Sequence, residues 1–134
     1  MMIKRSFLGL LVVTISVLLL AGCTPKIGVD PKTIDFGKTD SVKTIQVWND
    51  KFIVLKKLEF KIENDEASNI WIYGINPEQD VSKNRRDKRD ITILVSREGL
   101  EEGKSYDGKL TIKQVDSKTK KEVAPVEISI KISK

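Results

Sequence analysis

The sequence predicts an all-β fold, because short segments with period-two alternation recur along the chain between turn residues. The alternation is clearest in VEISIKISK at the carboxyl end, where apolar side chains from Val126 to Ile132 point one way and polar ones the other. It recurs in VKTIQVWN, KLEFKIE, DITILVS and GKLTIKQV. About seven short strands in roughly 110 residues predict an immunoglobulin-like β-sandwich. A closed barrel is the structural alternative.

The first segment, MMIKRSFLGLLVVTISVLLLAGC, has a different pattern. Lys4 and Arg5 precede an uncharged, mostly apolar run from Phe7 to Gly22, whose last two residues are small and stand directly before Cys23. These features are typical of a cleavable secretory signal peptide, which we expect to be helical. The run is shorter than the roughly 20 apolar residues of a spanning helix. An uncleaved anchor helix with an incidental cysteine is the alternative.

The motif Leu20-Ala21-Gly22-Cys23 resembles the lipobox of bacterial lipoproteins at every position. The resemblance implies that the Cys23 thiol is alkylated by a diacylglyceryl group and that the chain is cut before it. Two or three acyl chains would then hold the protein on a membrane. Thr24 is not the aspartate of an inner-membrane retention signal, so the outer membrane is implied for a Gram-negative source. For any other source, the outer face of the cytoplasmic membrane is implied.

The residue inventory argues against an enzyme. The chain has no histidine and one cysteine, which removes Cys–His and Ser–His–Asp catalysis and every zinc site that contains histidine. The clustered carboxylates fall in turn-like segments, and their spacing singles out no pair for glycoside hydrolysis. No calcium-loop or phosphate-loop motif occurs. We therefore expect no catalytic residue, no metal and no cofactor. The formal charge of +5 is only mildly basic, and nucleic acid is not an expected partner of an exported lipoprotein.

Four segments occur in this order: IGVDPKTIDFG (27–37), KTIQVWN (43–49), WIYGINP (71–77) and ITILVSREGLEEGKSYDGKLTI (91–112). Their residues and order resemble the BACON domain, a bacterial immunoglobulin-like module for which carbohydrate binding has been suggested. The most distinctive part is the glycine and tyrosine series of Gly99, Gly103, Tyr106 and Gly108. The segment from Trp71 to Pro77 is one residue longer than the pattern, which predicts a β-bulge at Gly74.

These observations predict a signal peptide at residues 1–22, a lipidated tether at 23–30 and a BACON-like β-sandwich at 31–134, with the first strand allowed to start near residue 26. The resemblance implies a non-catalytic binding module for glycan. A structural accessory or protein-interaction subunit of an envelope complex is the alternative. The expected partners are thus the membrane, through the acyl chains, and either a glycan or an envelope protein.

Aromatic side chains are the candidate glycan contacts, because sugars commonly stack on aromatic rings. The candidates are Trp48, Phe52, Trp71 and Tyr73. Trp48 is out of phase with Ile45 and Val47, so we expect it to face outward, where it forms a platform with Phe52 or is covered by it. Trp71 matches the tryptophan of the resemblance, and packing is its favoured role.

A charged stretch, SKNRRDKRD, supplies the candidate contacts for an anionic partner. These are Lys83, Arg85, Arg86, Lys88 and Arg89. Lys118, Lys120 and Lys121 could extend the same basic surface. A solvated loop without a binding role is the alternative interpretation of this stretch.

Overall fold

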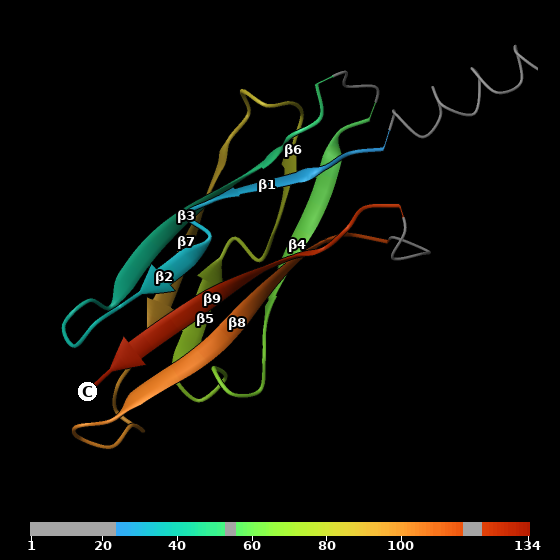
Figure 1. Cartoon of the computed structure of the whole chain (residues 1–134). Coiled ribbons are helices and arrows are strands. Elements are labelled where there is room, and N and C mark those ends of the chain that lie inside the picture. Colours follow the sequence, from blue (N-terminus) through green and yellow to red (C-terminus); the bar gives the residue numbers. More distant parts are fainter. Residues whose placement is uncertain (1–23, 53–55, 117–121) are drawn as a thin grey trace, which may run out of the picture.

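The computed structural model describes residues 24–52, 56–116 and 122–134, and nine strands within them form two sheets packed face to face (Figure 1). The four-stranded sheet has the order β1 (Ile27–Asp30), β3 (Val42–Asn49), β7 (Arg89–Val95) and β5 (Ile72–Asn76). The five-stranded sheet has the order β2 (Thr33–Asp35), β9 (Val126–Ser133), β8 (Ser105–Gln114), β4 (Leu58–Asn64) and β6 (Gln79–Ser82). The predicted immunoglobulin-like β-sandwich is confirmed, with nine strands instead of about seven.

The core lies between the sheets and is built from the inward-facing positions of the alternating strands. Ile128, Ile130 and Ile132 of β9 are at most 1% exposed, whereas the intervening Glu127, Ser129 and Lys131 face solvent. The buried apolar residues run from Ile27 to Ile132. Residues 24–134 therefore contain the whole core of the described domain, and we expect them to fold without the first 23 residues.

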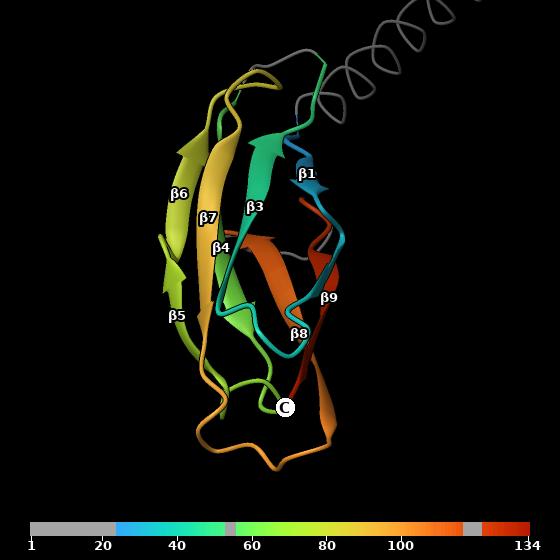
Figure 2. The ribbon, with the colours of Figure 1, turned by 90° about the vertical axis from the view of Figure 1, so that its left-hand side faces the viewer.

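On each side of the sandwich, a chain segment passes from one sheet to the other. On one side, β1 leads into β2 through the cis peptide Asp30–Pro31. On the other, β5 leads into β6 through the cis peptide Asn76–Pro77, and Figure 2 shows these two strands following one another along the edge. The β2–β9 pair is parallel, and all the other strand pairs are antiparallel.

The structure delimits two segments more closely than the sequence pattern does. Residues 79–82 carry no period-two apolar alternation in the sequence but form β6, which pairs with Leu58–Lys61 of β4. The first strand begins at Ile27, so residues 27–30 of the predicted tether belong to β1, as the allowance for a start near residue 26 anticipated. The signal peptide and Cys23 lie outside the described residues. Within the part of the chain that the structure describes, no helix is long and apolar enough to cross a membrane.

The bulge predicted at Gly74 is confirmed. Ile72 pairs with Val95 and Gly74 with Leu94, so Tyr73 is the extra residue of β5. A Cβ on Gly74 would lie 3.1 Å from the Leu94 Cδ1 atom, which is closer than nine in ten such contacts in proteins. Glycine at this position therefore makes room for the outward-facing Leu94 side chain.

Candidate binding surface

Trp48 is the second-to-last residue of β3 and lies on the outer face of the four-stranded sheet. Its neighbours Val47 and Asn49 are fully buried, and the Trp48 side chain is half-buried on the opposite face. The ring covers Gly28 of β1, the residue with which Trp48 pairs. A Cβ at Gly28 would lie 2.4 Å from Cε2 of the indole. The missing side chain on β1 therefore lets the ring lie close to the sheet.

Polar side chains follow Trp48 along the same face. Strand pairing places Gln46 between Asp30 and Asp90, and the Gln46 Nε2 atom donates a hydrogen bond to Asp90 Oδ1 at 3.1 Å. The next outward row pairs Thr44 with Thr92. Successive outward residues of a strand are about 7 Å apart. An aromatic ring is thus followed, at the spacing of a sugar ring, by amide, carboxylate and hydroxyl groups.

The Trp48 ring is held by an acidic and a basic neighbour. The indole Nε1 donates to Asp50 Oδ1 at 3.0 Å, and the Lys88 ammonium lies over the ring, 4.7 Å from its centroid. Cation–π contacts at exposed sites contribute about 0.5–1 kcal/mol. Lys88 is exposed, so a ligand that stacks on the ring could displace it at small cost.

Phe52 belongs to the same end of the sandwich but does not cover Trp48. Its side chain is 82% exposed, and the Arg85 guanidinium lies 5.5 Å from its ring centroid. The Arg85 Nε atom also donates to the Asp50 carbonyl oxygen at 3.0 Å and lies 3.3 Å from the Asp50 carboxylate. Asp50 therefore joins the two aromatic residues to the charged stretch, two sets that the sequence presented separately.

A buried polar pair that the sequence did not reveal holds these segments together. Asn49 and Ser82 are both fully buried, and the Asn49 backbone N–H donates to Ser82 Oγ at 2.9 Å. The Asn49 amide group accepts from the backbone N–H groups of Lys26 and Lys51 and donates to the Lys56 carbonyl. Ser82 Oγ lies 2.7 Å from the carbonyl oxygen of Asp87. The position of Asn49 at the end of the segment KTIQVWN was the available signal for this role.

Most of the predicted anion contacts are exposed at this end. Asp87 organises their loop: its carboxylate accepts from the Lys83 backbone N–H at 2.8 Å and from Arg89 at 3.4 Å. These hydrogen bonds, led by that from Lys83, lower the pKa of Asp87. Arg89 is also paired with Asp80 at 3.0 Å. By contrast, Lys83, Arg86 and Lys88 form no ion pair with any acid among the described residues.

Lowered carboxylate pKa values predict a loss of stability in acid. The Lys113 ammonium lowers the pKa of Glu63, and burial raises that of Asp65 but is outweighed by hydrogen bonds from Ser68 and Lys109. A carboxylate with a depressed folded-state pKa stabilises the fold above its unfolded-state pKa, and this contribution is lost as the pH falls through the folded value. We expect urea-unfolding free energies to be level from pH 7 to about 5 and to fall below about pH 4. Asp87→Asn should reduce that slope, and an unchanged slope would contradict the assignment.

The other two predicted aromatic contacts lie elsewhere. Tyr73 is 66% exposed, but its bulge adjoins Leu94, which pairs with Val42 at the opposite end of β3 from Trp48. Trp71 is 1% exposed and packs in the core, the role that the sequence favoured for it. The predicted aromatic set is therefore divided among two surface regions and the interior.

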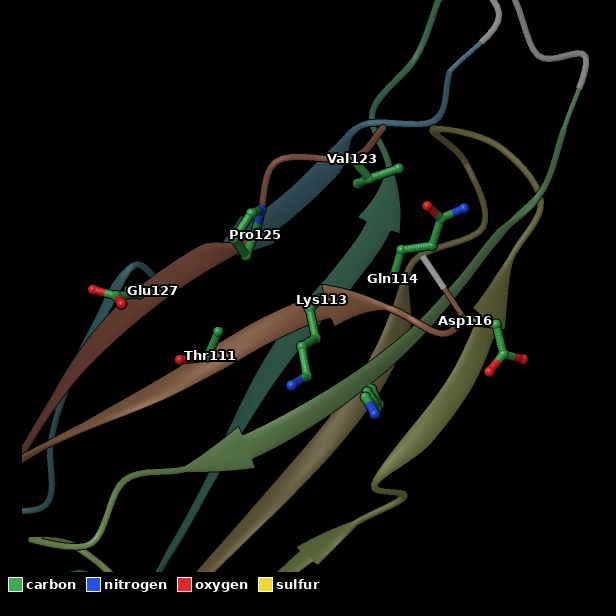
Figure 3. A pocket seen from close by; sticks show the side chains of 8 residues that line it. Thr111, Lys113, Gln114, Asp116, Val123, Pro125 and Glu127 are labelled. Carbon is green, nitrogen blue, oxygen red and sulfur yellow. The ribbon is translucent and has the colours of Figure 1, made fainter. Parts of the chain in front are cut away.

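A separate hollow of about 510 Å³ opens where β8 and β9 diverge (Figure 3). It is lined by Lys61, Thr111, Lys113, Gln114, Asp116, Val123, Pro125 and Glu127. The two cations that line the hollow, Lys113 and Lys61, are both paired with Glu63, at 2.7 Å and 3.6 Å. Residues 117–121, which include the three lysines predicted to extend the basic surface, lie outside the described residues. We assign no site to this hollow. No group of three or more potential metal ligands occurs within residues 24–52, 56–116 and 122–134.

The sequence matches no protein-family model and no curated protein. Solved structures share its fold at low sequence identity. The periplasmic chaperone SfaE is 9% identical, with a TM-score of 0.64 over 80% of this chain and 56% of that one. The chaperone–tip adhesion subunit complex CsuC–CsuE of Acinetobacter baumannii is 13% identical, with a TM-score of 0.58 and the same coverage. This chain thus spans about half the length of the chaperone chains.

A third structure with this fold is titled a "putative carbohydrate binding protein" from Bacteroides ovatus. It is 13% identical, with a TM-score of 0.54 over 82% of this chain and 37% of that one. The matched structures are non-catalytic immunoglobulin-like or PapD-like domains. At these identities the likeness establishes the fold alone.

Proposed function

We propose that the chain is an exported lipoprotein, anchored through Cys23, whose sandwich is a non-catalytic module that binds glycan on the outer face of its four-stranded sheet. The observation that carries this proposal is the Trp48 ring lying over Gly28, with Gln46 and Asp90 in the next row. Further support comes from the BACON resemblance and from the fold shared with the Bacteroides ovatus protein.

The surface suits a sugar for two reasons. The apolar face of a pyranose can stack on a flat indole, and its hydroxyl groups can exchange hydrogen bonds with carboxylate and amide side chains at the rim of the ring. Asp50 fixes the indole in place through Nε1, so little freedom of the ring is lost when a ligand binds. The proposed site is an open sheet face, which suits a length of polysaccharide better than a small enclosed ligand.

A glycan array with residues 24–134 tests this function, with two aromatic variants run in parallel. Trp48→Ala should weaken binding at least tenfold, which corresponds to about 1.4 kcal/mol. Tyr73→Ala is the matched control, because it removes an exposed aromatic side chain at the far end of the same sheet. A blank array, or equal losses in the two variants, would contradict the proposal.

The anchor has its own test. Cys23→Ser should abolish acylation and release the protein from the membrane fraction, because the thioether can form only on a thiol. Persistent acylation or unchanged membrane retention in that variant would contradict lipidation at Cys23. The expected location is the outer membrane for a Gram-negative source and the outer face of the cytoplasmic membrane otherwise.

A second function, a protein-binding accessory subunit of an envelope complex, is favoured by the open sheet edges. Within the described residues, β5 pairs only with β7 and β6 only with β4. Unpaired backbone groups at such edges can receive a strand from another chain. The fold shared with a chaperone–adhesion subunit complex is consistent with this alternative. A blank glycan array together with a reproducible partner in crosslinked envelope pull-downs would favour it.

A further inference from the structure

Charge is distributed unevenly along the sandwich. Residues 24–134 contain 22 lysines and arginines and 19 acids. Eight of these cations but only two of the acids occur in segments 24–26, 50–52, 56–57 and 83–88, which we call the cationic end. The other described residues have 11 cations against 17 acids. A mildly basic chain thus combines a strongly basic end with an acidic remainder of the described sandwich.

The fold brings the four segments of the cationic end to the same place. The Asn49 side chain bonds to backbone groups of Lys26, Lys51 and Lys56, and the Asp50 N–H donates to the Lys26 carbonyl at 2.7 Å. Arg85 reaches the Asp50 carbonyl from the β6–β7 connection. Both acids of this end, Asp50 and Asp87, are engaged by arginines. The unpaired lysine and arginine side chains are therefore free to meet an external anion.

An exposed aromatic side chain projects among these cations. A shallow depression of about 410 Å³ is lined by Lys51, Phe52, Asn84, Arg85 and Arg86. Phe52 is the most exposed large apolar side chain in the described residues. The connection that contains it has the sequence KFIVLKK, of which the structure describes all but residues 53–55. An apolar side chain surrounded by cations is the composition of a surface that inserts at the headgroup level of an anionic bilayer.

We infer that the cationic end docks on the surface of an anionic lipid bilayer, with Lys51 and Arg86 contacting headgroup phosphates and Phe52 inserted between them. The orientation rests on the lipidation proposed above. Cys23 is three residues from Lys26, so its acyl chains enter the membrane within about 11 Å of this end. The two or three acyl chains of such an anchor already hold the protein on the membrane, so a basic patch beside them sets which end of the sandwich faces the bilayer. Lys88 of this end lies over Trp48, so Trp48 is the part of the sheet face nearest the bilayer, and the rows of Gln46 and Thr44 extend away from it toward a glycan.

Vesicle cosedimentation of unlipidated residues 24–134 tests the inference. Vesicles of phosphatidylglycerol and phosphatidylcholine should bind the protein, and vesicles of phosphatidylcholine alone should not. Each cation near such a surface contributes about fivefold in affinity, so Lys51→Glu with Arg86→Glu should lower binding at least 25-fold. Phe52→Ser should lower it severalfold. Neither charge substitution, at Lys51 or at Arg86, removes a residue of the Asp50–Arg85 pair, so we expect the fold of the cationic end to be preserved.

The matched control is Lys38→Glu with Lys131→Glu, which makes the same change of net charge at exposed positions of the opposite end. It should leave binding within about twofold of the unchanged protein. Equal binding to neutral vesicles, or equal losses in the two double variants, would overturn the inference. Because the assay uses no acyl chain and no sugar, its outcome is independent of Cys23 lipidation and of glycan binding. The Cys23→Ser and Trp48→Ala experiments test those claims separately.

Discussion

Replacing Gly108 by alanine should lower the free energy of unfolding by about 3 kcal/mol, near the upper end of the usual cost of overpacking. Gly108 is a buried residue of β8, and a Cβ there would lie 2.5 Å from the Ser68 Cβ and 3.2 Å from the Trp71 ring. Neither neighbour can retreat easily. Ser68 is fully buried and bonded to Asp65 through its N–H and its hydroxyl, and Trp71 is enclosed in the core.

Urea unfolding monitored by tryptophan fluorescence measures the effect of this substitution. Gly99→Ala is the control, because Gly99 is exposed and a Cβ there would meet no atom within 4 Å. We expect the control to change the unfolding free energy by less than about 0.5 kcal/mol. A similar effect of the two substitutions would show that Ser68 and Trp71 do not pack on Gly108 as described.

Replacing Asn49 by alanine should cost about 2 kcal/mol, since its side chain joins three backbone groups inside a fully buried site. The loss should be concentrated at the cationic end of the sandwich, where these three backbone groups lie. Hydrogen exchange of the Lys26 and Lys51 amides should accelerate, because both donate to the Asn49 amide oxygen. Amides in the middle of β8 should change only through the global loss of stability.

Two further substitutions make the Asn49 prediction specific. Asn49→Asp keeps an acceptor for the two N–H groups but places a carboxylate oxygen near the Lys56 carbonyl, so it should not restore stability at pH 7. Asn69→Ala removes an exposed amide and should be nearly neutral. Restored stability in the aspartate variant would mean that the bond to Lys56 contributes little.

The strands that pack the core were largely predictable, because their signal is local. The alternation in β3, β7, β8 and β9 shows which side chains face inward, and it correctly placed Trp48 on the opposite side from Val47. The extra residue between Trp71 and Pro77 located the bulge. By contrast, β6 has the sequence QDVS, which carries no alternating apolar pattern. It is a strand because it pairs with β4, and that contact depends on the rest of the fold.

The candidate surface was predicted only in parts. Trp48 and Phe52 lie more than 30 residues from Arg85 and Lys88 in the sequence, and their proximity depends on the β3–β7 register and on the Asn49–Ser82 pair. No pattern in the sequence indicates that Gly28 lies beneath Trp48, because β1 and β3 are joined through a strand of the other sheet. Tyr73 and Trp71 belong to the same sequence segment, but β5 places Tyr73 beside Leu94, at the opposite end of the sheet from Trp48. Residue type suggested candidates, and tertiary pairing decided which of them meet.

The central claim, that ligand binds over Trp48, is tested most directly by the fluorescence of that residue alone. The chain has two tryptophans, and Trp71→Phe leaves Trp48 as the single reporter. The Trp71 indole nitrogen has no hydrogen-bond partner in the described structure, so phenylalanine removes no bond there. Titration with the glycan selected on the array should shift the Trp48 emission saturably and protect the indole from acrylamide quenching. Saturable binding of that glycan with unchanged emission and quenching would contradict the account, because the ligand would then lie elsewhere.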